Sequence, residues 1–218
     1  MTFAEIVSLV IDKLEGGYFH PNMLLDGRVK DARYSKSGET MFGIDRKQGG
    51  SINTSESGIK FWGLIDNANA ASNWKWNYKG GPLAPELKRL AADMLKPPFN
   101  TLSKLYLKTP QALQIVKDSA ALTFHFVYAT YNGSGWFKKF ASDIMAAINT
   151  GITDPAALSK IAISSRTNEG LKKGSPPNSL IAQSGNKIAK LFDTISTPAK
   201  IIVPILVVGI LLFLLLKK

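Results

Sequence analysis

The feature that most constrains this sequence is an uninterrupted apolar run near its carboxyl end. The sixteen residues from Ile201 to Leu216 carry no charged or polar side chain, and lysines flank the run on both sides. As a helix it would rise roughly 24 Å, somewhat less than the ~30 Å hydrocarbon core of a bilayer. Because Lys200 and Lys217 can lengthen the span by snorkelling, we expect residues 197–218 to form a membrane anchor. A buried core helix is the alternative, although such helices usually keep one polar face.

The residues before this run have the composition of a soluble domain followed by a connection. A chain of 218 residues can hold one sizeable core and an appendage, so we expect residues 1–169 to form one domain. The segment GLKKGSPPN predicts a linker over residues 170–179, and residues 180–196 have the pattern of an amphipathic helix. The amino terminus lacks a basic segment followed by an apolar one, so no cleavable signal peptide is expected.

The predicted domain begins with an amphipathic helix over Thr2–Leu14. Its apolar residues recur at helical spacing, and Thr2 with Glu5 has the pattern of a capping box. A Gly-Gly pair then stops the helix, which makes Glu15 its expected last residue. In the polar region that follows, Thr40–Ile44 has the pattern of a small hairpin.

Helical patterns dominate the remainder of the domain. The pair Pro97-Pro98 is expected to close one of these helices, because proline disrupts a helix interior. The order of elements predicts an α+β fold that is mostly helical. The expected helices cover residues 85–95, 102–107, 110–131 (as one helix or two), 136–148 and 155–168, with a polar loop over 49–58 and a short helix or strand over 59–65.

Charge and composition exclude several classes of site. The chain has no cysteine and two histidines, so we expect no disulfide, no metal centre and no cofactor. Its net charge of +11 predicts either an ordinary solvated surface or attraction to a polyanion such as a cell wall or anionic lipid. We expect no nucleic acid as a partner, because the basic residues form no arginine-rich stripe or known binding motif.

The main chemical signal is Glu15, which is followed by Gly16-Gly17 and then by the polar hairpin. A glutamate at the carboxyl end of a helix gains nothing from the helix dipole. Beside an apolar face it would hold its proton more tightly, which suits a general acid. The alternative is a solvated residue at a helix end, which is what most such glutamates are.

Three segments resemble glycoside hydrolase family 108, a group of peptidoglycan-cleaving enzymes with a lysozyme-like fold. Glu15–Tyr18 matches the family's Glu-Gly-Gly-Tyr at the end of the first helix. Gly38–Ile44 matches its Gly-Gly-x-Thr-x-Tyr-Gly-Ile segment, with Ser37 in place of the first glycine and Phe42 in place of the tyrosine. Phe126–Gly135 is similar to its helix that ends in an Asn-x-Gly turn. The middle of the chain, residues 51–118, does not match.

The resemblance implies that Glu15 is the catalytic acid and that Thr40 lies beside the cleft. A glycosidase usually pairs two carboxyl groups, so a second one is expected. Asp31 is the preferred candidate; Asp26 and Glu39 are alternatives, and all three also suit ordinary loop positions. Without a second carboxylate, a single glutamate can act by the lytic transglycosylase route.

Residues expected to contact the glycan come from the polar and aromatic segments. Trp74, Trp76 and Tyr78 alternate and would share one face of a strand, where aromatic rings can stack on sugars; core packing is the alternative. Trp62 is a further aromatic candidate for the cleft, whereas His125 is expected in the core. The remaining candidates for substrate binding are Tyr18, His20 and Glu39.

Together these features predict a membrane-anchored enzyme that cleaves the MurNAc-GlcNAc β-1,4 bond of peptidoglycan, as a lysozyme or a lytic transglycosylase. Its expected partners are glycan strands, a lipid bilayer, and capsid or membrane proteins of a virion. Anchoring in a virion membrane would serve phage entry, and anchoring in the host inner membrane would serve lysis. The alternative is an inactive lysozyme-like protein that binds glycan or has a structural role in a virion.

Overall fold

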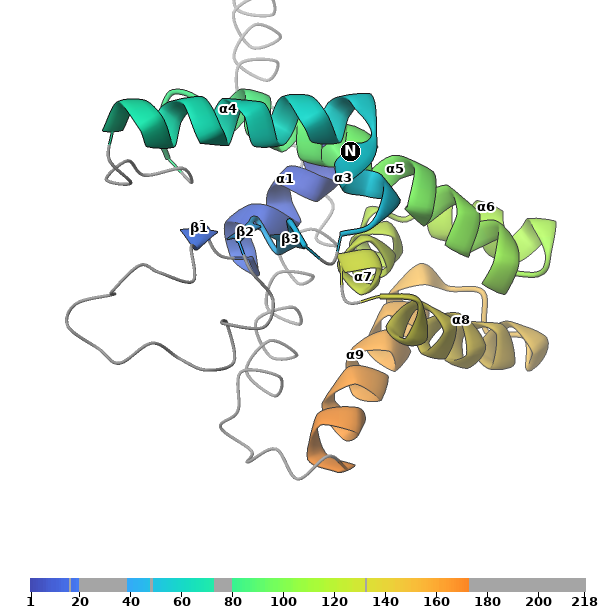
Figure 1. Cartoon of the computed structure of the whole chain (residues 1–218). Helices are drawn as coiled ribbons and strands as arrows, with labels where there is room; N and C mark the ends of the chain where they lie inside the picture. Colours follow the sequence, from blue (N-terminus) through green and yellow to red (C-terminus); the bar gives the residue numbers. More distant parts are fainter. Residues whose placement is uncertain (16, 20–38, 48, 73–79, 132, 173–218) are drawn as a thin grey trace, which may run out of the picture. The chain divides into compact units, whose positions relative to one another are not determined.

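The computed structural model describes residues 1–15, 17–19, 39–47, 49–72, 80–131 and 133–172. Over these ranges the chain is mostly helical, with eight helices and a small antiparallel sheet, as predicted (Figure 1). The chain separates into two units, Met1–Ser165 and Arg166–Lys218, and the packing given below is that of the first. None of the helices in the described ranges is long and apolar enough to cross a membrane. The predicted segments 180–196 and 197–218 lie outside those ranges.

The first helix, α1 (Phe3–Lys13), begins with the predicted capping box. The Thr2 N–H donates to the Glu5 carboxylate at 2.6 Å, and the Glu5 N–H donates to the Thr2 hydroxyl at 3.3 Å. The helix ends earlier than predicted: Leu14 is its C-cap, and Glu15 lies just past it rather than in it. The Glu15 N–H still donates to the Val10 carbonyl at 3.2 Å, so Glu15 stays attached to the helix end.

Three short strands follow, β1 (Tyr18–Phe19), β2 (Thr40–Met41) and β3 (Ile44–Asp45), which pair antiparallel in that order. Thr40 lies opposite Phe19 on one side and Asp45 on the other. This confirms the predicted hairpin at Thr40–Ile44. The sheet has one further strand, β1, which begins at Tyr18, three residues after Glu15.

The turn between β2 and β3 consists of Phe42 and Gly43, both with positive φ (53° and 76°). Such a pair is typical of a type I′ hairpin turn. A non-glycine residue in this conformation costs roughly 1–2 kcal/mol. The Phe42 ring is fully buried, edge-on to Phe61 at 6.3 Å, and this burial offsets the cost.

The remaining helices differ from the prediction mainly in their bounds. The prediction of a polar loop over residues 49–58 is wrong, because α3 and the start of α4 lie there. The pattern over 110–131 is two helices, α6 and α7, and α9 extends through three residues of the predicted linker. The bounds are α3 (Ser51–Thr54), α4 (Glu56–Ser72), α5 (Ala84–Tyr106), α6 (Pro110–Asp118), α7 (Ala120–Tyr131), α8 (Ser134–Asn149) and α9 (Pro155–Lys172).

Helix α5 continues through Pro97 and Pro98, so the prediction that they end a helix is wrong. Each proline removes a backbone donor and costs about 3 kcal/mol in a helix interior. Pro97 is exposed, whereas Leu95 and Phe99 on the other side of the helix are buried. Because α5 packs against α1, α3, α4, α7 and α8, burial of that face offsets the local cost.

The centre of the unit is α7, in which every residue from Ala121 to Ala129 is buried. A helix that is buried all round needs neighbours on several sides, and α1, α5, α6 and α8 contact it. Aromatic rings join these helices: Phe99 lies 5.0 Å from Phe3 and 6.2 Å from Phe137, and Phe126 lies 4.8 Å from Phe137. His125 lies in this core, as predicted.

Candidate active site

The Glu15 side chain lies against the turn of the β2–β3 hairpin. A methyl group added to Gly43 would stand 2.7 Å from the Glu15 carboxyl carbon and 3.2 Å from its Cγ. Gly43 therefore meets two requirements: it adopts positive φ, and it leaves room for the carboxyl group. The Glu15 side chain is half-buried, so it faces neither bulk water nor the closed core.

A groove of about 720 Å³ lies next to this turn. Gly43, Ile44 and Asp45 of the hairpin form one wall, and α5 contributes another. Residues 49–52, at and before the start of α3, contribute a third part of the lining. The end of α7 and the start of α8 complete it with Thr130, Tyr131, Gly133 and Ser134. The groove is large enough for part of an oligosaccharide, since ligand pockets typically measure about 300–1,000 Å³.

Tyr131 lines the groove and interacts electrostatically with Glu15. Its hydroxyl is buried and has no hydrogen-bond partner among the described residues. Burial raises the pKa of Tyr131 well above the ordinary value, and the negative charge of Glu15 raises it further. The hydroxyl therefore keeps its proton at any physiological pH and can act as a hydrogen-bond donor beside the groove.

Gly133 explains how Tyr131 comes to line the groove. α7 ends at Tyr131 and α8 begins at Ser134, with Gly133 as its N-cap at φ 89°. Residues at the end of α7 and at the start of α8 therefore both lie in the groove wall. α7 ends at Tyr131, as the helical pattern over residues 110–131 predicted.

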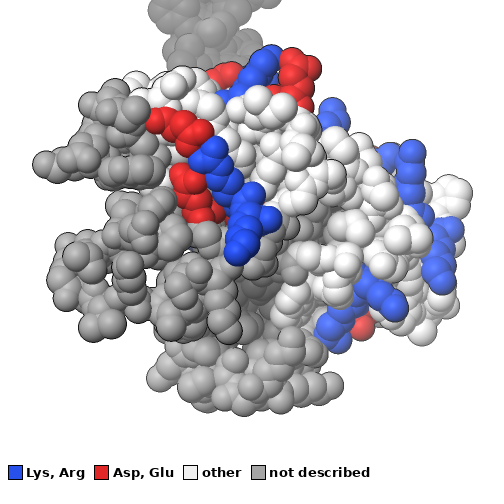
Figure 2. Space-filling model, viewed as in Figure 1, with Lys and Arg blue, Asp and Glu red and all other residues white. Residues whose placement is uncertain are grey.

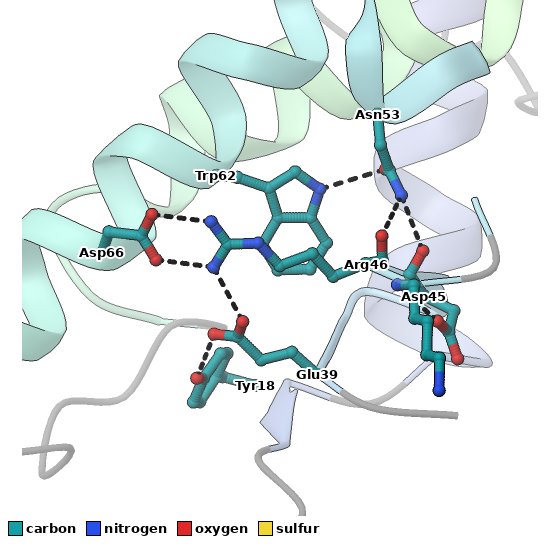
Figure 3. A network of polar contacts seen from close by, with 8 residues as sticks. Tyr18, Glu39, Asp45, Arg46, Asn53, Trp62 and Asp66 are labelled. Atoms are coloured by element: carbon teal, nitrogen blue, oxygen red, sulfur yellow. Dashed lines mark hydrogen bonds and ion pairs between the residues drawn. The ribbon is translucent and has the colours of Figure 1, made fainter. Parts of the chain in front are cut away.

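A network of polar contacts holds the hairpin to α3 and α4 (Figure 3). The Arg46 guanidinium donates to both carboxylate oxygens of Asp66, at 2.6 and 2.7 Å, and to Glu39 at 2.7 Å. It also lies over the Trp62 ring, 5.0 Å from the centroid. Hydrogen bonding to Asp66 raises the pKa of Arg46 further above its ordinary range, so its charge is permanent.

Asn53 completes this network from α3. Its side-chain N–H groups donate to the Asp45 and Arg46 carbonyls, each at 2.8 Å, and its oxygen accepts from the Trp62 indole at 3.0 Å. Bidentate and charge-assisted contacts of this kind fix geometry as well as adding stability. The hairpin that carries Gly43 is therefore a rigid support for the Glu15 carboxyl group.

The predicted site residues divide into those that the structure brings together and those that it does not describe. Glu15 and Thr40 lie on the α1 end and the hairpin, and Thr40 is half-buried. Tyr18 donates from its hydroxyl to Glu39, so both predicted glycan contacts take part in the network around Arg46. The other predicted residues, Asp31, His20, Trp74, Trp76 and Tyr78, lie outside the described ranges.

Trp62 was a candidate for the cleft with core packing as the alternative, and the structure shows core packing: the residue is 4% exposed and packs on Phe61 and Arg46. Three residues at the site were not predicted from the sequence: Gly43, Tyr131 and Asp45. The positive φ of Gly43 could have been anticipated from its place in a two-residue turn. The roles of Tyr131 and Asp45 depend on which segments meet at the groove, which no local pattern indicates.

Comparisons of the chain with protein-family models, with curated proteins and with solved structures found no match.

Proposed function

We propose that this chain is a peptidoglycan-cleaving glycosidase with a lysozyme-like fold and that Glu15 is its catalytic acid. The observation that carries the proposal is the position of Glu15. Its carboxyl group lies on the hairpin turn at Gly43, which borders the same groove as Tyr131. These residues come from the three segments in which the chain resembles family 108, and a mostly helical domain with a small sheet after the first helix is what that resemblance implies.

In this proposal Glu15 donates its proton to the oxygen of the MurNAc-GlcNAc β-1,4 bond as that bond breaks. The sugar left behind has oxocarbenium character, and its fate depends on a second group. In a lysozyme, a second carboxylate stabilises that sugar or activates water. Asp31 is the candidate from the sequence, and Asp45, which lines the groove, is a second candidate. In a lytic transglycosylase, Glu15 takes a proton from the muramic 6-hydroxyl, which then closes on the anomeric carbon.

The proposed context is a membrane surface. Residues 197–218 would anchor the enzyme in a virion membrane, where it opens the wall during phage entry, or in the host inner membrane, where it acts at lysis. Peptidoglycan and its attached polymers are anionic, so the net charge of +11 would favour encounter with them. An inactive glycan-binding protein is the alternative that the following experiment separates.

The test uses the full-length protein in detergent on isolated peptidoglycan, with mass spectrometry of the released fragments. Wild type is expected to release disaccharide fragments, and Glu15→Gln is expected to release almost none. Glu5→Gln is the matched control, because it makes the same change in the first turn of α1, at an exposed carboxylate that forms the capping box. Reducing ends would identify a hydrolase, and anhydro ends a transglycosylase. If wild type releases no fragment, or if Glu15→Gln equals wild type, the proposal is wrong.

A further inference from the structure

Among the described residues of the first unit, some lysines and arginines pair with carboxylates and others do not. Near the hairpin, α4 and the start of α5, cations meet carboxylates: Arg46 meets Asp66, Lys60 meets Glu56, and Arg89 meets Glu86. Figure 2 shows blue and red side chains together in that region. At the carboxyl end of α5 and the start of α8, Lys104, Lys108 and Lys138 are exposed, and none pairs with a carboxylate of the described residues.

A groove of about 640 Å³ lies between α5 and α8 at this end. Lys108 and Lys138 contribute its charged lining, and Leu105, Tyr106, Met145 and Ala146 contribute its apolar lining. Leu105 leaves 57% of its surface exposed. The groove therefore combines an apolar surface with positive charge that the rest of the described unit does not neutralise.

We propose that this groove docks the folded domain on an anionic phospholipid bilayer. The lysines would contact the phosphates, each contributing roughly 1 kcal/mol near a charged leaflet, while their stems and Leu105 reach the apolar region below. A wall polymer or a nucleic acid would use the lysines but would give Leu105 no apolar partner. The observations thus favour lipid over other polyanions.

This docking goes beyond the proposed glycosidase function and does not depend on Glu15. The docking groove shares no lining residue with the groove beside Gly43. A membrane contact through α5 and α8 would therefore leave the candidate active site unobstructed by direct overlap. It would also give the domain a preferred orientation that an anchor alone does not impose.

The chain has no cysteine, so single-cysteine variants can carry an environment-sensitive dye at a chosen position. Leu105→Cys reports on the docking groove. Ile59→Cys is the matched control, because Ile59 is an equally prominent apolar residue, 65% exposed, beside the paired Lys60 and Glu56. Full-length protein is reconstituted with vesicles of phosphatidylcholine alone or with phosphatidylglycerol added, and flotation measures the bound fraction.

At equal bound fraction, the dye at position 105 is expected to shift to the blue with phosphatidylglycerol and to lose that shift in high salt. The dye at position 59 is expected to give the same emission in both vesicles. Charge reversal in Lys108→Glu/Lys138→Glu should abolish the shift, whereas Lys47→Glu/Lys60→Glu, which reverses two exposed lysines elsewhere, should preserve it. Equal shifts at both positions, or a shift at position 105 without anionic lipid, would overturn the proposal.

Peptidoglycan release by Lys108→Glu/Lys138→Glu keeps the two proposals apart. A variant that loses the dye shift but still cleaves isolated peptidoglycan supports docking as a separate property. If wild type cleaves no peptidoglycan while dye-labelled Leu105→Cys gives the shift, the glycosidase proposal is refuted and the docking proposal stands.

Discussion

Two glutamates contact the same β-hairpin, and their surroundings differ completely. Glu39 is 13% exposed and is held by the Arg46 guanidinium at 2.7 Å and by the Tyr18 hydroxyl. Glu15 lies on the bare backbone of Gly43, with the buried Tyr131 hydroxyl within electrostatic reach. The first carboxylate is fully engaged in holding the hairpin, whereas the second is supported by it. A glutamate's role here is set by its neighbours and not by its place in a motif.

The largest expected effect is the loss of peptidoglycan cleavage when Glu15, but not Glu39, is replaced by glutamine. If Glu15 is the general acid, as proposed, Glu15→Gln should reduce peptidoglycan cleavage by about 10²–10⁴-fold and should leave the melting temperature nearly unchanged. Glu39→Gln should keep most of the activity but lower the free energy of unfolding by about 1–3 kcal/mol, since a buried charge-assisted contact is lost. Initial rates and thermal unfolding check both. Equal losses of activity would contradict the contrast.

The contact between Glu15 and the turn can be tested at Gly43. Gly43→Ala places a methyl group 2.7 Å from the Glu15 carboxyl carbon on a backbone with φ 76°. We expect a loss of roughly 1–3 kcal/mol in the free energy of unfolding and a strong loss of activity. Gly151→Ala is the control, because Gly151 has φ 90° but nothing within 4 Å of the added methyl. It should lose stability and keep activity. If Gly43→Ala also keeps activity, the geometry around Glu15 is not what catalysis requires.

The contacts that hold Glu39 and the hairpin in place depend on Arg46. Arg46→Met should lower the free energy of unfolding by about 1–2 kcal/mol after allowance for its partial exposure, because Glu39 loses a partner and the hairpin loses its link to α4. Arg89 also joins two carboxylates, Glu86 and Asp93, but on the solvent face of α5. Arg89→Met should therefore barely change the melting temperature. Chemical denaturation of both variants measures the difference, and similar losses would mean that the network around Arg46 does not fix the hairpin.

The local elements were predictable because their signals are local. The capping box of Thr2 and Glu5, the hairpin at Thr40–Ile44 and the turn at Gly133 each depend on a few adjacent residues. The continuation of α5 through Pro97 was not predictable, because burial against five other helices outweighs the local cost. In the site, Glu15 and the hairpin were predicted, but the link between Arg46 and Asp66 spans 20 positions without a periodic pattern.

The smallest expected effect concerns the Tyr131 hydroxyl. Tyr131→Phe removes a buried polar group that has no partner in the described residues, so its free energy of unfolding at pH 7 should lie within about 0.5 kcal/mol of wild type. If the hydroxyl donates to the sugar in the groove, cleavage should fall about tenfold, the equivalent of one hydrogen bond.

The pH dependence of stability in the same variant tests whether the Tyr131 hydroxyl is buried in the folded protein. Burial, and then the charge of Glu15, raise the pKa of Tyr131 in the folded protein above the ordinary value of 10.0. Above about pH 10 the unfolded chain releases this proton and the folded protein keeps it, so the folded state binds more protons and loses stability as pH rises. Tyr131→Phe lacks this loss and should become the more stable of the two proteins above that pH. A stability difference that stays constant from pH 7 to 11 would mean that the Tyr131 hydroxyl is solvated, and the close relation between Tyr131 and Glu15 would then not hold.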